Sequence, residues 1–421
     1  MLIEFRVENH RSLRDEQVLT MQAGQVGDPD DDRPRLVPGY AQRLLPVAAI
    51  YGANASGKSN VLDALVFMYD AVLWSHRTWS PDKGIHRDPF AWGPKRKKPT
   101  LFEVTVVVGD VRYQYGFTAS SDRFLEEWLY AWPNDRKQTW FSRYGDAFKF
   151  GDNLKGENKQ IEGFTRDNAL FLSTAAQHNH KQITPIFSWF ESLRTINCDR
   201  QWHILGRDSI HDDKEALSRF KKTKWLTFET LPEPVATHLL ALLKNADLGI
   251  VDLRVKPEAQ GSNAPLFTMN LYEFKHRAKA RDAWLDFEQE SKGTKHLFYI
   301  AIPLLLALTQ GRTILVDELE TSLHPAIAQN LVRLFNDPKT NPRNAQLIFT
   351  THDTNLLGTT LGEPVLRRDQ VWLTEKDGEG ATVLYPLTDF KPRKAENIER
   401  GYLQGRYGAV PFLGDFVAAT E

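Results

Sequence analysis

The chain has 421 residues, 41% of them hydrophobic and 25% charged, with 53 Lys and Arg against 54 Asp and Glu and a formal net charge of −1. This composition excludes a disordered tail and a membrane channel, and it is typical of a globular protein with two or three domains. The single cysteine, Cys198, excludes an internal disulfide and a thiolate zinc cluster, so we expect a reducing, cytoplasmic location.

The first residues, 1–7, alternate apolar and charged side chains, which predicts a β-strand and not a secretory signal. The longest apolar run, 297–308, is too short to cross a bilayer and contains Pro303, so it predicts a buried helix and no membrane role. Two basic clusters, 95–98 and 221–224, are expected to be solvated loops, with contacts to nucleic-acid phosphates as the alternative.

A strand, a glycine-rich loop and a helix follow one another in the first part of the chain. Residues 45–51 form an apolar run of strand length, and apolar residues recur at helical spacing over 61–69. The loop between them matches the phosphate-binding pattern G-x-x-x-x-G-K-S in the context that this pattern requires. The residues that we expect to surround the phosphates of a nucleotide are Gly52, Ala53, Asn54, Ala55, Ser56, Gly57, Lys58, Ser59 and Asn60.

Each part of this loop has a chemical reason. Glycines let the backbone wrap closely around phosphates, and the loop amides and the helix N-terminus supply positive potential. Lys58 is expected to neutralise the charge of the β- and γ-phosphates, and Ser59 is expected to ligate magnesium.

The predicted secondary structure divides the rest of the chain into three parts. Residues 101–150 are rich in β-branched and aromatic side chains, which predicts an antiparallel β lobe. The next stretch is mixed and mostly helical, and helix and strand then alternate to the end. The predicted parts are the first half of a nucleotide-binding head (1–150), a mostly helical insertion (151–285) and the second half of the head (286–421).

Two strand ends in the last part carry polar side chains. The strand 312–316 ends in Asp317 and Glu318. At the C-terminal edge of a parallel sheet, Asp317 can reach the magnesium ion while Glu318 faces the attacking water. The strand 346–350 leads to His352, which can hydrogen-bond the γ-phosphate or the water. We therefore predict Glu318 and His352 as catalytic residues and Ser59 and Asp317 as metal ligands.

About 260 residues separate Lys58 from Asp317, so a β lobe and an insertion lie between two halves of one site. In this the chain resembles ABC-type ATPases of the RecF, structural-maintenance-of-chromosomes and overcoming-lysogenisation-defect kind, and most of all bacterial AAA-type ATPases of RloA or abortive-infection type. The resemblance implies an α/β fold, a P-loop NTPase with an ABC-type split head. The segments that carry it are 1–12, 52–60, 290–294, 317–325 and 402–411.

The resemblance also assigns roles. Ser291 and Gly293 stand where the signature of ABC-type ATPases lies, although Lys292 replaces the usual glycine. In that family these residues contact the γ-phosphate bound on the opposite subunit, which implies a homodimer or higher oligomer with ATP between the subunits. The loop 319–324 would cross that interface. By analogy with the Asn-Phe-Arg-Ser opening of the group, Arg11 is expected at the nucleotide, with a surface salt bridge as the alternative.

By resemblance, the protein is an ATPase that requires ATP and Mg²⁺, closes as a dimer and controls a separate effector protein, a nuclease or toxin, in anti-phage defence. No intrinsic nuclease is expected. The alternative is a RecF-like, ATP-dependent DNA-binding clamp in DNA repair or maintenance. The sequence has no Asn-Lys-x-Asp tetrapeptide, with which GTPases usually read guanine, and this favours ATP. The wide separation of the two halves disfavours a transporter subunit.

Overall fold

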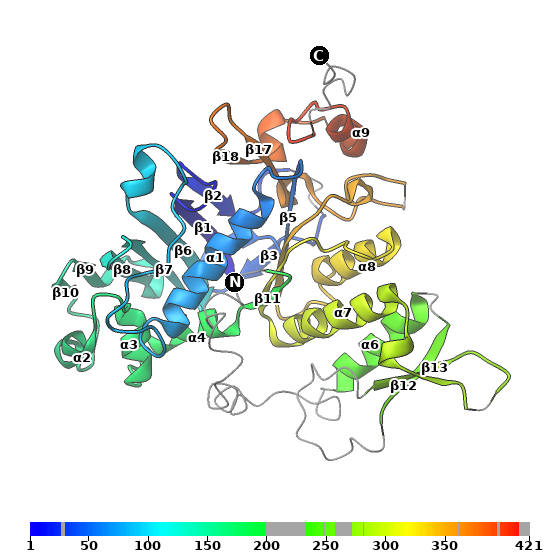
Figure 1. Cartoon of the computed structure of the whole chain (residues 1–421), viewed down its shortest axis with the longest axis horizontal. Coiled ribbons are helices and arrows are strands. Elements are labelled where there is room, and N and C mark those ends of the chain that lie inside the picture. The colour runs from blue at the N-terminus through cyan, green and yellow to red at the C-terminus, as the bar shows by residue number, and fades with distance from the viewer. Residues whose placement is uncertain are drawn as a thin grey trace.

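The computed structural model describes residues 1–26, 30–198, 233–246, 249–256, 272–280, 282–360, 362–393 and 396–411. The basic cluster 221–224 lies outside these residues. The described residues form two large β-sheets, with helix α1 (Lys58–Trp74) packed between them (Figure 1). None of the helices in these ranges is long and apolar enough to span a bilayer.

The antiparallel sheet forms the β lobe, with seven strands in the order β10-β9-β8-β7-β6-β1-β2. Gly109 and Asp110 both have positive φ, as a tight two-residue hairpin between β6 and β7 requires. The predicted N-terminal strand and antiparallel lobe are confirmed. The strands are β1 (Leu2–Glu8), β2 (Gln17–Thr20), β6 (Thr100–Val108), β7 (Val111–Ala119), β8 (Phe124–Trp132), β9 (Gln138–Tyr144) and β10 (Ala147–Phe150).

The second sheet carries the strand ends at which most predicted site residues lie. Its order is β11-β15-β16-β5-β17-β18, and all neighbouring strands are parallel except β17 and β18. β16 therefore lies between β5, which precedes the glycine-rich loop, and β15, which precedes Asp317. The strands are β5 (Val47–Gly52), β11 (Arg194–Ile196), β15 (Thr313–Val316), β16 (Gln346–Thr350), β17 (Val371–Lys376) and β18 (Thr382–Pro386).

Both faces of the parallel strands are buried. On β5, Ala48 and Ile50 belong to the core shared with α1 and the β lobe, whereas Val47, Ala49 and Tyr51 belong to the core on the opposite face. This burial on both faces explains why β5, β15 and β16 read as continuous apolar runs. The helices that contribute to the opposite core are α6 (Glu233–Asn245), α7 (Lys292–Gln310) and α8 (Pro325–Asn336).

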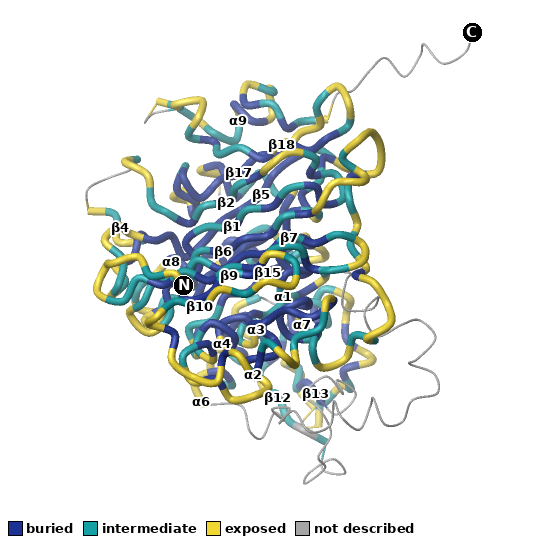
Figure 2. The backbone as a smooth tube through the Cα atoms, turned by 90° about the vertical axis from the view of Figure 1, so that its left-hand side faces the viewer, coloured by how far each residue is buried: buried dark blue, intermediate teal, exposed yellow. Residues whose placement is uncertain are grey.

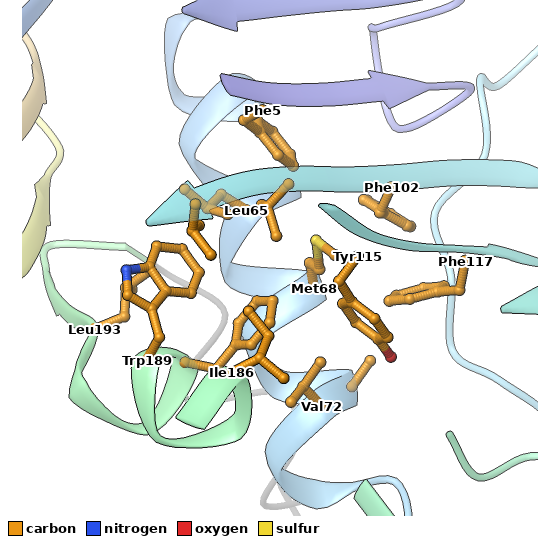
Figure 3. Close-up of a cluster of buried hydrophobic side chains, with 14 of the residues drawn as sticks. Phe5, Leu65, Met68, Val72, Phe102, Tyr115, Phe117, Ile186, Trp189 and Leu193 are labelled. Carbon is orange, nitrogen blue, oxygen red and sulfur yellow. The ribbon is translucent and has the colours of Figure 1, made fainter. Parts of the chain in front are cut away.

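Helix α1 is the middle layer. Leu65 and Met68 of α1 lie among Phe102 of β6, Tyr115 of β7 and Trp189 of α4 (Figure 3). Buried residues, dark blue in Figure 2, run along the central strands and α1, whereas exposed residues gather in the outer loops. Since α1 begins at the glycine-rich loop, its packing on both sides fixes where that loop lies. The helices that share this core with α1 are α2 (Asn158–Phe164), α3 (Phe171–Gln177) and α4 (Thr184–Ser192).

The predicted middle part, 151–285, contributes to more than one layer. Its helices α3 and α4 pack beside α1, α2 packs on α3, and its strand β11 joins the six-stranded sheet. Its three-stranded sheet packs Tyr272 and Phe274 against Phe298 of α7. The predicted α/β class with a P-loop head and an antiparallel β lobe is confirmed, while the three-part division stays a prediction. The remaining elements are β3 (Arg35–Val37), β4 (Tyr40–Leu44), β12 (Ile250–Val255), β13 (Tyr272–His276), β14 (Trp284–Asp286) and α9 (Ile398–Leu403).

One buried glutamine joins the two sheets. Gln346, at the start of β16, is 1% exposed. Its Nε2 donates to the carbonyls of Leu2 (2.9 Å) and Leu45 (3.2 Å), and its Oε1 accepts the N–H of Leu2 (2.5 Å). The first residue of β1 is therefore tied to the strand that lies between β5 and β15.

We expect Gln346→Leu to lower the free energy of unfolding by about 3 kcal/mol, because a buried main-chain donor and two acceptors lose their partner. The measurement is urea unfolding followed by circular dichroism. The control is Gln404→Leu, whose side chain is exposed and which should change stability by less than about 0.5 kcal/mol. Equal stabilities for the two variants would contradict this role of Gln346.

Candidate functional site

The glycine-rich loop lies at the C-terminal edge of the parallel sheet, between the end of β5 and the start of α1. Two of its residues have positive φ, Ala55 at 61° and Gly57 at 105°. Gly57 is the N-cap of α1, and no side chain caps this helix end. The amides of the first turn are thus available to an anion, as expected for a phosphate loop.

A chain of hydrogen bonds connects the loop to the turn after β1 and to the β17–β18 hairpin. Asn60 Nδ2 donates to Ser12 Oγ (2.6 Å), which lies 2.7 Å from Thr382 Oγ1. Thr382 Oγ1 in turn donates to the carbonyl of Ser56 (2.7 Å), so Ser12 is the donor to Thr382. Ser56 Oγ lies 2.7 Å from Thr374 Oγ1. The β17–β18 hairpin and the turn after β1 therefore fix the shape of the loop.

These contacts explain why glycine is required at positions 52 and 57. A Cβ atom at Gly57 would lie 2.1 Å from Thr382 Oγ1 and 2.8 Å from Ser12 Oγ. A Cβ atom at Gly52 would lie 2.4 Å from Thr374 Oγ1. Sequence reasoning identified the glycines but missed both threonines, since they stand more than 300 residues later and match no motif.

Lys58 is buried, although the residue after it is exposed. Its Nζ donates to the carbonyls of Gly52 (3.0 Å) and Ala53 (3.1 Å). Burial lowers the pKa of Lys58, while the carboxylates that follow β15 act in the opposite direction. The structure thus brings the ammonium group of the loop and the acids of the second half of the chain into one electrostatic site.

Ser59 and Asp317 meet across the sheet, with Ser59 Oγ 3.1 Å from Asp317 Oδ1. Thr350, fully buried at the end of β16, also donates its hydroxyl to Asp317 Oδ1. Burial is the largest influence on Asp317 and raises the pKa of its carboxyl, against the hydrogen bonds from Thr350 and Ser59. Sequence reasoning predicted the pair but missed Thr350, which reads as one more strand residue.

This pair of oxygen donors fits magnesium. Mg²⁺ prefers oxygen ligands and usually takes only one or two from the protein, with waters and substrate phosphates completing the shell. The described ranges hold no cluster of three or more His, Cys, Asp or Glu side chains able to bind a metal. Two oxygen donors, Ser59 Oγ and Asp317 Oδ1, are as many as the protein usually supplies to magnesium when phosphates and waters complete the shell.

Glu318 has a left-handed backbone, with φ of 54°. Its amide donates to Thr350 Oγ1 (2.8 Å), and its Oε2 accepts the hydroxyl of Thr321 (3.2 Å). A non-glycine residue in this region is strained and persists only where the surroundings enforce it. The side chain is exposed, unlike the buried strand that precedes it.

His352 follows β16 and is exposed. Its main-chain amide donates to Glu320 Oε1 at 2.6 Å. Partial loss of solvent around the ring is the largest influence on the pKa of His352 and lowers it from its ordinary value, and the nearby Lys58 lowers it further. The neutral imidazole, which carries one donor and one acceptor nitrogen, is thus favoured near pH 7.

The predicted signature residues begin α7. Ser291 is the N-cap of this helix, and its Oγ accepts the amide of Thr294 (3.1 Å). A Cβ atom at Gly293 would lie 3.5 Å from the carbonyl of Ser322. Gly293 therefore lies beside the loop 319–324 of its own chain. The hydrogen bonds of Ser291 in the described part of the chain are to Thr294.

Arg11 lies in a salt bridge. Its Nε is 3.1 Å from Asp63 Oδ2 on α1 and 3.3 Å from Asp88 Oδ2. The buried His10 also contacts Asp63, with Nε2 2.7 Å from Oδ2. The structure therefore places Arg11 on the first turns of α1 through Asp63, and contact with a nucleotide stays a prediction.

The C-terminal segment 402–411 lies against the strand that leads into the loop. The rings of Tyr402 and Tyr51 meet edge to face, with centroids 5.6 Å apart. Tyr402 donates its hydroxyl to the carbonyl of Ala409 (3.1 Å), and the amide of Ala409 donates to Glu375 of β17 (3.3 Å). This segment thus supports the edge of the sheet on which the phosphate loop stands.

A family described as "AAA domain, putative AbiEii toxin, Type IV TA system" matches residues 47–358. The chain belongs to this family. The matched range of this AAA-family chain runs from β5 to just beyond His352, and so includes the phosphate loop, Ser291 and Asp317. No curated protein matches the chain. Among solved structures, the SMC head domain from Thermotoga maritima is similar over 91% of this chain and 98% of that chain, with 13% sequence identity and a TM-score of 0.40.

We expect Gly57→Ala to lower the free energy of unfolding by about 2 kcal/mol, because alanine is strained at this positive φ and its Cβ would meet Thr382. Gly163→Ala is the matched control, since no atom lies within 4 Å of its added Cβ and the residue is in α2. There alanine should stabilise by about 0.5 kcal/mol. The measurement is urea unfolding of both variants. A Gly57→Ala protein as stable as wild type would show that the loop is not held by these contacts.

Proposed function

We propose that the protein binds ATP together with magnesium and hydrolyses it to ADP and phosphate. The observation that carries the proposal is the 3.1 Å contact between Ser59 Oγ and Asp317 Oδ1, because it joins a phosphate loop to an acidic strand end from the other half of the chain. When bound, magnesium would neutralise the charge that develops on the phosphates. The family of AAA domains supports this assignment.

The side chains divide the work by chemistry. Lys58 and the uncapped amides of α1 hold the phosphates. Glu318 accepts a hydrogen bond from the attacking water, which orients the water, and then takes its proton. Its carboxylate is suited to this role because it is exposed beside the metal ligands. The neutral imidazole of His352 offers a hydrogen bond to the γ-phosphate or to that water.

We further propose that two chains close around ATP. Ser291, Glu318 and His352 are exposed in the single chain, and the signature lies beside the loop 319–324. Ser291 and Gly293 would then contact the γ-phosphate held by the other subunit. Because the N-terminus of a helix attracts anions, the N-terminus of α7 is suited to contact a phosphate.

The output that we propose is control of a separate effector, a nuclease or toxin, in cytoplasmic anti-phage defence of the RloA or abortive-infection kind. The family description, which refers to an AbiEii toxin and a type IV toxin–antitoxin system, favours this setting. A RecF-like DNA clamp is the second candidate, and among the described residues the basic cluster 95–98, which is largely exposed, favours it. The clamp requires binding to duplex DNA that weakens steeply with salt.

Hydrolysis is tested by the Glu318→Gln protein. We expect kcat to fall by at least about 100-fold, because a general base is lost, while ATP binding is retained. Phosphate release measures turnover, and equilibrium binding of a fluorescent ATP analogue measures affinity. Lys58→Ala is the control and should bind no nucleotide. A Glu318→Gln protein that turns over ATP as fast as wild type would contradict the proposed mechanism.

Dimer closure is tested by the solution mass of Glu318→Gln, measured by light scattering with and without magnesium and ATP. We expect ATP to raise the mass to that of a dimer, or to tighten an existing dimer, because ATP and the signature together complete each site. The same experiment on Lys58→Ala should show no change. If nucleotide binds and the mass ignores it, Ser291 and Gly293 do not act across an interface.

A further inference from the structure

The turn after β15 is joined to the end of β16 residue by residue. Each of its four residues makes a hydrogen bond to the segment 350–352, and only the last of these bonds reaches His352. The bonds are Thr350 Oγ1 to Asp317 Oδ1, Glu318 N to Thr350 Oγ1 (2.8 Å), Leu319 N to the Thr350 carbonyl (3.1 Å) and His352 N to Glu320 Oε1 (2.6 Å).

The main chain on either side of His352 is held by other groups. The amide of Thr351 donates to the carbonyl of Ile50 on β5 (3.1 Å), and the carbonyl of Asp353 accepts the hydroxyl of Tyr51 (3.0 Å). The amide of His352 has Glu320 as its partner. The carboxylate of Glu320 is therefore the group that holds the main-chain amide of His352 itself.

From this geometry we propose that Glu320 is a positioning residue, which holds His352 at a fixed spacing from Glu318. The proposal rests on the ATPase function proposed above. Glu318 and Glu320 stand on one turn, and Glu320 binds the amide of the residue that bears the imidazole. A movement of that turn is thereby transmitted to both groups that we place at the γ-phosphate.

The burial of the Glu320 side chain supports a functional reason for this residue. Its second oxygen, Oε2, is buried and has no hydrogen-bond partner among the described residues. A buried, unbonded carboxylate oxygen is costly, and such groups persist where function requires them. Glu320 also acts on the pKa of Lys58 in the raising direction, so this side chain lies within electrostatic reach of the phosphate loop.

The first test is hydrogen–deuterium exchange of the peptide that contains His352, measured on the protein without nucleotide. Glu320→Ala should speed exchange of the His352 amide by about tenfold, because its acceptor is lost. Glu320→Gln keeps an oxygen acceptor and should exchange as wild type does. Glu363→Ala, which removes an exposed acid far along the chain, is the matched control. Unchanged exchange in Glu320→Ala would overturn the proposal.

The second test is turnover. Glu320→Ala should lower kcat by about 10- to 100-fold with KM changed by less than about threefold, because the imidazole is displaced while the phosphate loop is intact. Glu320→Gln should restore most of kcat. If Glu320→Gln is as inactive as Glu318→Gln, the charge of Glu320 acts in the chemistry itself and the positioning role is wrong.

The outcomes separate this proposal from the one on which it rests. A wild-type protein without ATPase activity overturns the proposed function, whereas the exchange of the His352 amide still decides the contact with Glu320. If Glu320→Ala does not fold, Glu320→Asp replaces it. The shorter side chain cannot reach the amide, so the same faster exchange is expected, and exchange at the wild-type rate would overturn the proposal.

Discussion

Parallel pairing of β16 with both β5 and β15 is the constraint on which the site depends. β5 ends at the phosphate loop, β15 ends at Asp317, and β16 ends at Thr350. Because the carboxyl ends of parallel strands lie at one edge, this pairing brings segments about 300 residues apart to the same place. The hydroxyl of Thr350 then joins Asp317 to the amide of Glu318. The two halves of the chain thus share one site.

Two non-glycine residues of the proposed site, Ala55 and Glu318, have a strained left-handed backbone. Both residues stand in turns that follow strands buried on both sides, and Gly57 in the same loop has positive φ, which glycine adopts without strain. The strain is held by rigid neighbours: α1 packs between two sheets, and the β17–β18 hairpin fixes the loop through its threonines. A loop held in this way is already shaped for phosphates before a nucleotide binds, which lowers the cost of binding.

Burial divides the site into a fixed base and an open face. Lys58 and Thr350 are buried, whereas Ser59, Glu318, His352 and Ser291 are exposed. The base supplies position, since its groups are bonded to strands, and the open face is the part that a second subunit could complete. In our proposal ATP binding and subunit closure are one event, and Glu320 connects the two strand ends that would respond to it.

The sequence by itself determined the local elements and the residues that match motifs. The strand, glycine-rich loop and helix over 45–69, the strand before Asp317 and the core helices and strands lie where the sequence predicts them, because apolar periodicity and glycine spacing are local signals. Thr350, Glu320 and the two threonines of the β17–β18 hairpin were missed, because nothing in their own neighbourhood marks them. The tertiary structure alone decided these contacts, and also that Arg11 binds Asp63, because side-chain partners tens to hundreds of residues away are selected by strand order and packing and not by local pattern.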